Sequence, residues 1–325
     1  MRRREVIATL GSAAAWPLVA RAQQAVRVPR ICYLSPAARF NHLDEAFENA
    51  LHQLGWVKGR DINIEYRYTD GRQDKIAPLV TEVIGLGPDL FVAWGPPLAL
   101  GIKQAAPQSP VVFLITAFDP IELGLVSNLS RPGGNVTGIT FASEQIIAKR
   151  LELLKEVVPS LARVAVLFST ERNRSSETLN ALKTAAKAFR IELDEVEVEV
   201  PQSLEAAMRE AKHRGAQAVY VWQGGFSFAF GKEISDVANA LGLPSIHWFR
   251  EAVLAGGLLA YATDLIQEAE RGAAYVDKIL RGTPPGSLPV EQMSKYELVI
   301  NLKTAKVLGL TIAPSIMARA HEVIE

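Results

Sequence analysis

The sequence contains few of the residues on which disulfides, metal sites and nucleic-acid surfaces depend. Cys32 is the only cysteine among 325 residues, so no internal disulfide can form, and its apolar neighbours predict a buried, unreactive thiol. The five histidines lack both the i, i+4 spacing and the cysteine partners of a metal site, so we expect no bound metal. Lysine plus arginine and aspartate plus glutamate number 35 each, which leaves no basic excess to bind nucleic acid.

Motifs of common enzymes and cofactor sites are also absent. Residues 225–229 fail the last position of the G-x-S-x-G nucleophile elbow, and neither a phosphate-binding loop nor a dinucleotide fingerprint occurs. Asp119 and Asp264 could form an acid pair, but a single aspartate after a strand more often caps a helix. We therefore expect no enzyme activity and no cofactor.

Long hydrophobic runs are missing apart from one near the N-terminus. Arginines at positions 2–4 precede an apolar run over residues 6–19, which closes on Ala20-Arg21-Ala22. This order predicts a secretory signal peptide over residues 1–22, and the leading arginines favour the twin-arginine route. The run is too short to span roughly 30 Å of hydrocarbon. We expect the rest of the chain to be a periplasmic protein and a monomer.

Short apolar runs alternate with amphipathic stretches through the rest of the chain, which is typical of α/β folds with parallel sheets. In the first half we expect strands at 30–34, 62–68, 90–94 and 111–116, and helices at 43–54, 76–86 and from Pro96 onward. A further helix is expected at 144–158.

The second half repeats the plan of the first. Its apolar segments at 163–169, 215–222 and 244–248 echo those at 30–35, 87–94 and 110–114. They follow in the same order at nearly one offset, which favours a repeated plan over a chance likeness between strands. The sequence therefore predicts two doubly wound parallel-sheet lobes with a hinge and an interlobe cleft.

The expected lobe boundaries follow from this repeat. Residues 28–138 and about 262–288 form lobe I, and residues 139–261 and about 289–325 form lobe II. Glycine-rich stretches at 133–138 and at Gly256-Gly257 mark the expected crossings between the lobes. Glycine there either supplies permissive hinge dihedrals or serves an ordinary turn.

The residues that follow the strands make up the candidate binding site, because open parallel sheets bind ligands beyond the carboxyl ends of their strands. Two facing lobes place those ends on opposite walls of one cleft, where small-molecule sites concentrate. The aromatic candidates are Trp94, Trp222, Trp248 and Tyr261, and the polar candidates are Ser35, Thr116, Asp119, Ser169, Thr170, Asn173, Gln223 and Asp264. Pro36, Gly95 and Pro97 adjoin them.

Two pairs among these candidates match between the repeats. Trp94 and Trp222 could sandwich a flat or apolar ligand, or each could fill the core of its lobe. Ser35 and Ser169 precede helices whose free N–H groups attract carboxylates or phosphates, or each caps its own helix or turn. The sequence thus predicts capture of a small-molecule ligand and leaves its identity open.

The residues from Pro110 to Thr140 closely resemble one family of ABC-transporter substrate-binding proteins. The likeness lies in Asp119-Pro120 and in the string Leu129-Ser130-Arg131-Pro132-Gly133-Gly134-Asn135-Val136-Thr137-Gly138. Residues 301–310 and the arginine-led start ending in Ala22-Gln23-Gln24 are similar too. That family includes tryptophan- and other aromatic-amino-acid-binding members. The resemblance implies a type I periplasmic-binding fold that closes on its ligand by a hinge, with an ABC permease and its ATPase as partners.

One position departs from the pattern of that family. Its members commonly carry a serine or threonine after the glycine that follows the third strand, whereas this chain has Pro96 after Gly95. Proline offers neither a hydroxyl nor an N–H group, so a ligand contact expected there is missing. An aromatic or other apolar carboxylate is still compatible with the site. The alternative to an importer component is a periplasmic sensor that docks a membrane receptor, with the same fold and cleft.

Overall fold

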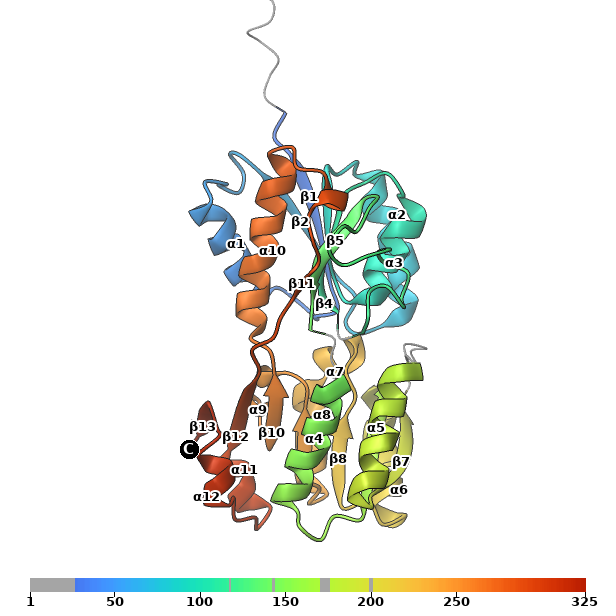
Figure 1. Cartoon of the computed structure of the whole chain (residues 1–325), viewed down its shortest axis with the longest axis vertical. Helices are drawn as coiled ribbons and strands as arrows, with labels where there is room; N and C mark the ends of the chain where they lie inside the picture. Colours follow the sequence, from blue (N-terminus) through green and yellow to red (C-terminus); the bar gives the residue numbers. More distant parts are fainter. Residues whose placement is uncertain (1–26, 117, 142–143, 170–175, 199–200) are drawn as a thin grey trace, which may run out of the picture.

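The computed structural model describes residues 27–116, 118–141, 144–169, 176–198 and 201–325. They form two α/β lobes, one above the other along the longest axis of the molecule (Figure 1). The predicted signal peptide lies outside the described residues. Within those residues, no helix combines the length and the apolar character that a membrane crossing requires.

Lobe I contains a six-stranded parallel sheet between two layers of helices. The strand order is β11-β5-β4-β3-β1-β2, with β1 at Arg30–Ser35, β2 at Asn63–Tyr68, β3 at Leu90–Trp94, β4 at Val111–Thr116, β5 at Val136–Thr140 and β11 at Glu291–Gln292. Helices α1 (His42–Gln53) and α10 (Leu265–Leu280) cover one face, and α2 (Ile76–Gly85) and α3 (Pro96–Ala105) cover the other (Figure 1).

Lobe II contains a seven-stranded sheet. The strand order is β13-β12-β10-β9-β8-β6-β7, with β6 at Arg163–Ser169, β7 at Glu192–Val198, β8 at Ala218–Val221, β9 at Ser245–His247, β10 at Leu259–Ala262, β12 at Glu297–Asn301 and β13 at Glu322–Ile324. Its helices are α4 (Glu144–Val157), α5 (Ser176–Phe189), α6 (Pro201–His213), α7 (Gly225–Ala229), α8 (Gly231–Ala240), α9 (Arg250–Leu254), α11 (Leu302–Val307) and α12 (Pro314–Met317). Strand β12 runs antiparallel to β10.

The predicted repeat is confirmed by the strand order. The order β2-β1-β3-β4-β5 of lobe I recurs as β7-β6-β8-β9-β10 in lobe II. Apolar runs such as residues 31–34 form central strands because helices cover both faces of each sheet, and all four of these side chains are fully buried. The predicted fold class, two doubly wound lobes, is therefore correct.

Local signals fix the ends of several elements. Asn41 and Asp44 form a capping box at the start of α1. Helix α3 starts at Pro96 because Gly95 makes the turn before it with a φ of 92°, which glycine tolerates. Cys32 is buried in the lobe I sheet as predicted, and burial raises its pKa to about 11, so the thiolate form is disfavoured at neutral pH.

The chain crosses between the lobes three times, and the glycine-rich stretches do not form these crossings. Gly138 lies inside β5, which is paired with β4 at this point. Only glycine fits there, because a side chain would meet the Phe113 carbonyl oxygen at 2.1 Å. Gly257 precedes β10, where a side chain would meet the His247 ring at 2.7 Å. Both glycines therefore serve close packing within one lobe.

The three crossings connect β5 to α4, β10 to α10, and β11 to β12. The expected boundaries at residues 138, 261 and 288 fall two, one and four residues before the ends of β5, β10 and β11, at Thr140, Ala262 and Gln292. The third crossing is tied to the first, because Met293 N–H donates to the Thr140 carbonyl at 2.8 Å and Tyr296 Oη donates to the Phe141 carbonyl at 2.9 Å.

Candidate functional site

A cavity of about 50 Å³ lies between the two lobes, where the carboxyl ends of their central strands face each other. Lobe I lines it with Pro36, Thr69, Gly71, Arg72, Gln73, Ile76, Trp94, Gly95, Pro96, Pro97, Leu98, Ile115 and Phe118. Lobe II lines it with Gln223, Gly224, Gly225, Phe228 and Trp248. The lining is mostly apolar, which suits a ligand with a hydrophobic body.

Two tryptophans from opposite lobes line this cavity. Trp94 is the last residue of β3 and Trp248 directly follows β9, and both are buried. The Trp248 ring is fixed because its Nε1–H donates to Ser227 Oγ at 2.9 Å and it stacks on Phe141, with ring centroids 6.2 Å apart. Trp94 packs against Tyr33, and its buried Nε1–H has no hydrogen-bond partner. A ligand could satisfy that donor, since buried polar groups are rarely left unpaired.

The wall that lobe I contributes contains a strained residue. Ile115 has a φ of 51°, which a β-branched residue rarely adopts, and it lies where the pairing of β4 with β5 shifts register. Its N–H donates to the Glu268 carboxyl group in α10, which holds this strand end in place. Burial raises the pKa of Glu268 to about 8, so the carboxyl group is mostly protonated at neutral pH.

The loop after β2 touches lobe II directly. Gly71 has a φ of 64°, and a side chain on it would meet Ala229 Cβ at 2.9 Å and the Gly225 carbonyl oxygen at 3.0 Å, both in α7. Only glycine allows this approach of the two backbones. The contact closes the cavity on one side, so the lobes stand in a closed arrangement.

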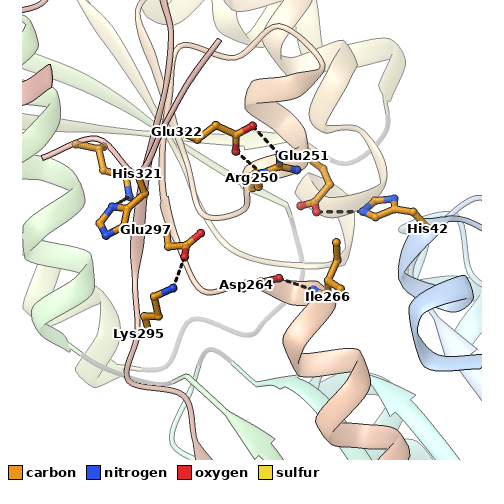
Figure 2. A network of polar contacts seen from close by, with 10 residues as sticks. His42, Arg250, Glu251, Asp264, Ile266, Lys295, Glu297, His321 and Glu322 are labelled. Carbon is orange, nitrogen blue, oxygen red and sulfur yellow. Dashed lines mark hydrogen bonds and ion pairs between the residues drawn. The ribbon is translucent and has the colours of Figure 1, made fainter. Parts of the chain in front are cut away.

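A second contact between the lobes lies on another side of the molecule. His42 Nε2 at the start of α1 is 3.1 Å from Glu251 Oε1 in α9, as Figure 2 shows. The hydrogen bond that His42 donates to Glu251 raises the pKa of His42, because it favours the protonated ring. Lobe I and lobe II are thus joined by a polar contact outside the cavity as well as by the Gly71 contact at its edge.

A second hollow, of about 330 Å³, lies beside the crossing from β10 to α10. Its charged groups already have partners: Arg250 pairs with Glu322, Lys295 with Glu297, and Glu251 with His42 (Figure 2). These pairs neutralise most of the charge around the hollow, and Glu251 Oε2 is the buried side-chain oxygen among its described lining residues that lacks a hydrogen-bond partner. Nowhere among the described residues do three or more histidine, cysteine, aspartate or glutamate side chains gather to hold a metal ion.

A sequence model of the ABC transporter substrate binding protein family matches residues 34–324 of this chain. The chain belongs to that family. The tyrosine-binding protein of Clostridioides difficile (strain R20291) is 26% identical to this substrate-binding protein over 272 residues, which cover 82% of this chain and 77% of the relative.

Solved structures show the same fold. A conserved domain protein from Vibrio cholerae O1 biovar eltor str. N16961 matches with a TM-score of 0.83 at 24% identity, over 91% of this chain and 100% of that one. The ABC domain from Streptococcus pneumonia, solved in complex with L-Trp, matches with a TM-score of 0.81 at 24% identity, over 91% and 99% of the two chains.

Some of the predicted site residues of this substrate-binding protein line the cavity. They are Pro36, Trp94, Gly95, Pro97, Gln223 and Trp248. Thr170 and Asn173 lie outside the described residues, and so does the side chain of Thr116.

Four predicted polar residues do not line the cavity. Ser35, Asp119 and Asp264 each accept backbone N–H groups two or three residues further along the chain, so they cap a turn or a helix. Asp264 is the N-cap of α10. Ser169 is the half-buried last residue of β6.

Two predicted aromatic residues also lie away from the cavity. Trp222 is 5% exposed and packs against Phe168 and Tyr220 inside lobe II, with ring centroids 5.0 and 6.3 Å away. Tyr261 stacks on Tyr296 beside the crossings, with centroids 5.8 Å apart. The residue that lobe II places in the cavity with Trp94 is therefore Trp248.

The sequence interpretation missed the loop after β2 and one residue of α4. Thr69, Gly71, Arg72 and Gln73 follow a predicted strand, so the same strand-end rule could have found them. Arg150 was missed although it interrupts the apolar stripe formed by residues 147, 151 and 154 of α4. A charged residue inside such a stripe is the signal that could have revealed it.

Proposed function

We propose that this substrate-binding protein captures a small molecule with a flat, apolar body between its lobes, outside the cytoplasm. It then presents the molecule to an ABC permease that is driven by its ATPase. One observation carries the ligand class: Trp94 and Trp248, from opposite lobes, line one mostly apolar cavity. Aromatic walls of this kind give large contact area to a planar ligand. The export step rests on the predicted signal peptide.

The relatives support an aromatic ligand. One is named a tyrosine-binding protein, and one structural neighbour was solved with L-Trp. Pro96 lines the cavity, and proline offers no hydrogen-bond donor there. The ligand therefore gains apolar contact at this position, and its polar groups must be recognised elsewhere in the cleft.

Capture requires the lobes to move. A cavity of about 50 Å³ holds only a few water molecules, since one water needs roughly 10–15 Å³ measured in this way. An aromatic ligand enters only if the Gly71 contact with α7 and the His42 contact with Glu251 open and then re-form. Binding is thus coupled to a hinge motion about the three crossings, and we expect no chemical turnover of the ligand.

Native mass spectrometry of the protein purified without added ligand tests this proposal directly. We expect either a bound aromatic compound or, after unfolding and refolding, a saturable rise in melting temperature with L-tryptophan, L-tyrosine or benzoate. Recovery of each probe unchanged would support the absence of turnover. A co-purified sugar or aliphatic compound, or no response to any of the three probes, would contradict the ligand class.

The transport step has its own test. The permease and ATPase proposed as partners can be reconstituted in vesicles loaded with ATP, with the ATPase facing the ATP. We expect uptake of the bound compound only when the substrate-binding protein is added outside. ATP-independent binding to a different membrane receptor would instead point to a sensor.

A further inference from the structure

Arg150 is a buried cation without a counter-ion. Its side chain lies in α4 and is 1% exposed, and among the described residues no carboxylate forms an ion pair with it. The other described arginines that take part in ion pairs do so at the surface. Arg72, which also lines the cavity, is half exposed and is already held by both oxygens of Asp74.

The contacts of Arg150 use only part of its hydrogen-bonding capacity. Nε donates to the Tyr261 carbonyl at 2.8 Å and Nη1 donates to Gln223 Oε1 at 2.9 Å, while Nη2 is buried without a partner. The Tyr220 hydroxyl group also interacts with the guanidinium, and Tyr296 lies nearby. Both are neutral at physiological pH, since burial raises the pKa of their hydroxyl groups. Among the described residues, the groups that contact the guanidinium are thus dipoles rather than negative charges.

This arrangement is costly unless something compensates it. Burial lowers the pKa of Arg150, yet a guanidinium keeps its proton in proteins, so the group stays charged. A buried charge and an unpaired buried donor are each unfavourable without a partner. Ile147, Leu151 and Leu154 fill the rest of the stripe on α4, so packing alone gives no reason for an arginine at this position.

Gln223 connects this charge to the cavity. It lines the cavity on the lobe II side, next to Gly224 and Gly225, and its Oε1 accepts from Arg150 Nη1. The two glycines carry no side chains that would cover this part of the wall. Only the side chain of Gln223 therefore separates an anionic group at this part of the wall from the guanidinium of Arg150.

We propose that Arg150, together with Gln223, binds a carboxylate group of the ligand. The planar guanidinium fork matches the two oxygens of a carboxylate, and the free Nη2–H supplies a donor that is not otherwise used. The aromatic body of the ligand then extends toward Trp94 and Trp248. This inference rests on the proposed function and specifies the ligand as an aromatic carboxylate.

Paired probes test the inference on the full chain. Benzoate and L-tryptophan carry the carboxylate, whereas benzamide and L-tryptophanamide are close in shape and lack that negative charge. We expect wild-type protein to bind each acid at least tenfold more tightly than its amide. Arg150→Gln should lower the affinity for the acids at least tenfold and change that for the amides less than twofold. Arg209→Gln, which removes an exposed arginine from α6, is the matched control and should change neither.

A second variant keeps the inference testable if Arg150→Gln fails to fold. Gln223→Glu places a carboxylate beside Arg150, so we expect it to raise the melting temperature and to lower the affinity for the acids at least tenfold. If wild-type protein binds acids and amides equally, or if Arg150→Gln weakens both equally, the carboxylate subsite is overturned while the proposed function stands. If wild-type protein binds none of the four probes, the proposed ligand class itself fails.

Discussion

The two lobes share one strand order but present different walls to the cleft. Lobe I lines it with rigid apolar groups such as Pro36, Pro96 and Ile115 and, in the loop after β2, with polar side chains. Lobe II lines it with two glycines, two aromatic rings and Gln223, which contacts Arg150. The difference arises after the strands: α3 begins two residues after Trp94, and α7 begins three residues after Trp222. A repeated scaffold thus fixes where the walls stand, while the few residues between strand and helix fix what each wall recognises.

The lobes also differ in the kind of ionisable group that each one buries. Lobe I buries Glu268, whose pKa burial raises to about 8, and lobe II buries His247, whose pKa burial lowers to about 3. Each group is held neutral at pH 7. We therefore expect lobe I to lose stability as the pH rises from 4.5 to 8, and lobe II to lose it as the pH falls from 6.5 toward 3.

The largest expected effects concern the tryptophans. Replacing Trp94, Trp222 or Trp248 with alanine should each cost about 3–5 kcal/mol of unfolding free energy, because all three are buried. Trp94→Ala and Trp248→Ala should also weaken ligand binding by more than about 1 kcal/mol, whereas Trp222→Ala should not. Calorimetric titration below the melting temperature of each variant measures this. A larger loss of affinity in Trp222→Ala than in Trp248→Ala would break the assignment of the lobe II wall.

Closure is tested at Gly71. Gly71→Ala should lower ligand affinity at least tenfold, about 1.4 kcal/mol, because the new methyl group meets α7 only when the lobes are closed. Gly87→Ala is the matched control: its φ is 58°, but a side chain there meets no atom within 4 Å. Both changes should cost stability by roughly 1–2 kcal/mol through left-handed backbone strain. Equal affinities of the two variants would show that the Gly71 contact does not limit closure.

The buried acid of lobe I gives a pH-dependent effect. The pKa of Glu268 is about 8 in the folded protein, above its ordinary value of 4.5, so the unfolded state loses the proton first. Stability should therefore fall as the pH rises from 4.5 to 8, by at most about 1.4 kcal/mol per pH unit. Glu268→Gln keeps an acceptor for Ile115 N–H and removes the titration. Its melting temperature relative to wild type should rise with pH, and parallel pH profiles would contradict this account.

His247 gives the opposite dependence in lobe II. Its pKa is about 3 in the folded protein, below the ordinary 6.5, so stability should be lost as the pH falls from 6.5 toward 3. Limited proteolysis at pH 5 and at pH 8.5 can separate the lobes, with lobe II fragments expected first in acid and lobe I fragments first in base. If lobe I fragments appeared first in acid and lobe II fragments first in base, the proposed difference in pH dependence between the lobes would be wrong.

The smallest expected effect is at the contact between His42 and Glu251. Glu251 raises the pKa of His42, so the closed state gains stability that is present below the ordinary pKa of 6.5 and is lost as the pH rises through the raised value. His42 is 48% exposed, and exposed pairs contribute about 0.2–1 kcal/mol. Ligand affinity should thus fall less than about fivefold at high pH, and His42→Gln should flatten this change. Titrations at pH 5.5 and 8.5 would measure it.

Much of this fold was predictable because its strands are short, buried on both faces and repeated. Strand direction predicted where the cleft lies, and the candidates Trp94, Gln223 and Trp248 line the cavity found there. The crossings were not predictable from glycine content. Gly138 and Gly257 are needed instead because Phe113 and His247 approach them too closely for a side chain.

Other parts of the site depend on contacts between residues far apart in sequence. Trp222 matches Trp94 in the repeat, but its orientation depends on Phe168 and on the later start of α7. Arg150 lies 73 residues from Gln223, and nothing local links the two. Such pairings become visible only when the lobe is assembled.

The three crossings also have a mechanical consequence. Separate flexible tethers would let the lobes twist, slide and tilt independently. Here hydrogen bonds from Met293 to Thr140 and from Tyr296 to Phe141 join the first and third crossings, so we expect the two segments to bend as one unit. Two segments joined side by side bend easily in one direction and resist twisting. We therefore expect opening to follow nearly one angular coordinate, along which Gly71 returns to α7 and Trp94 returns to the wall opposite Trp248.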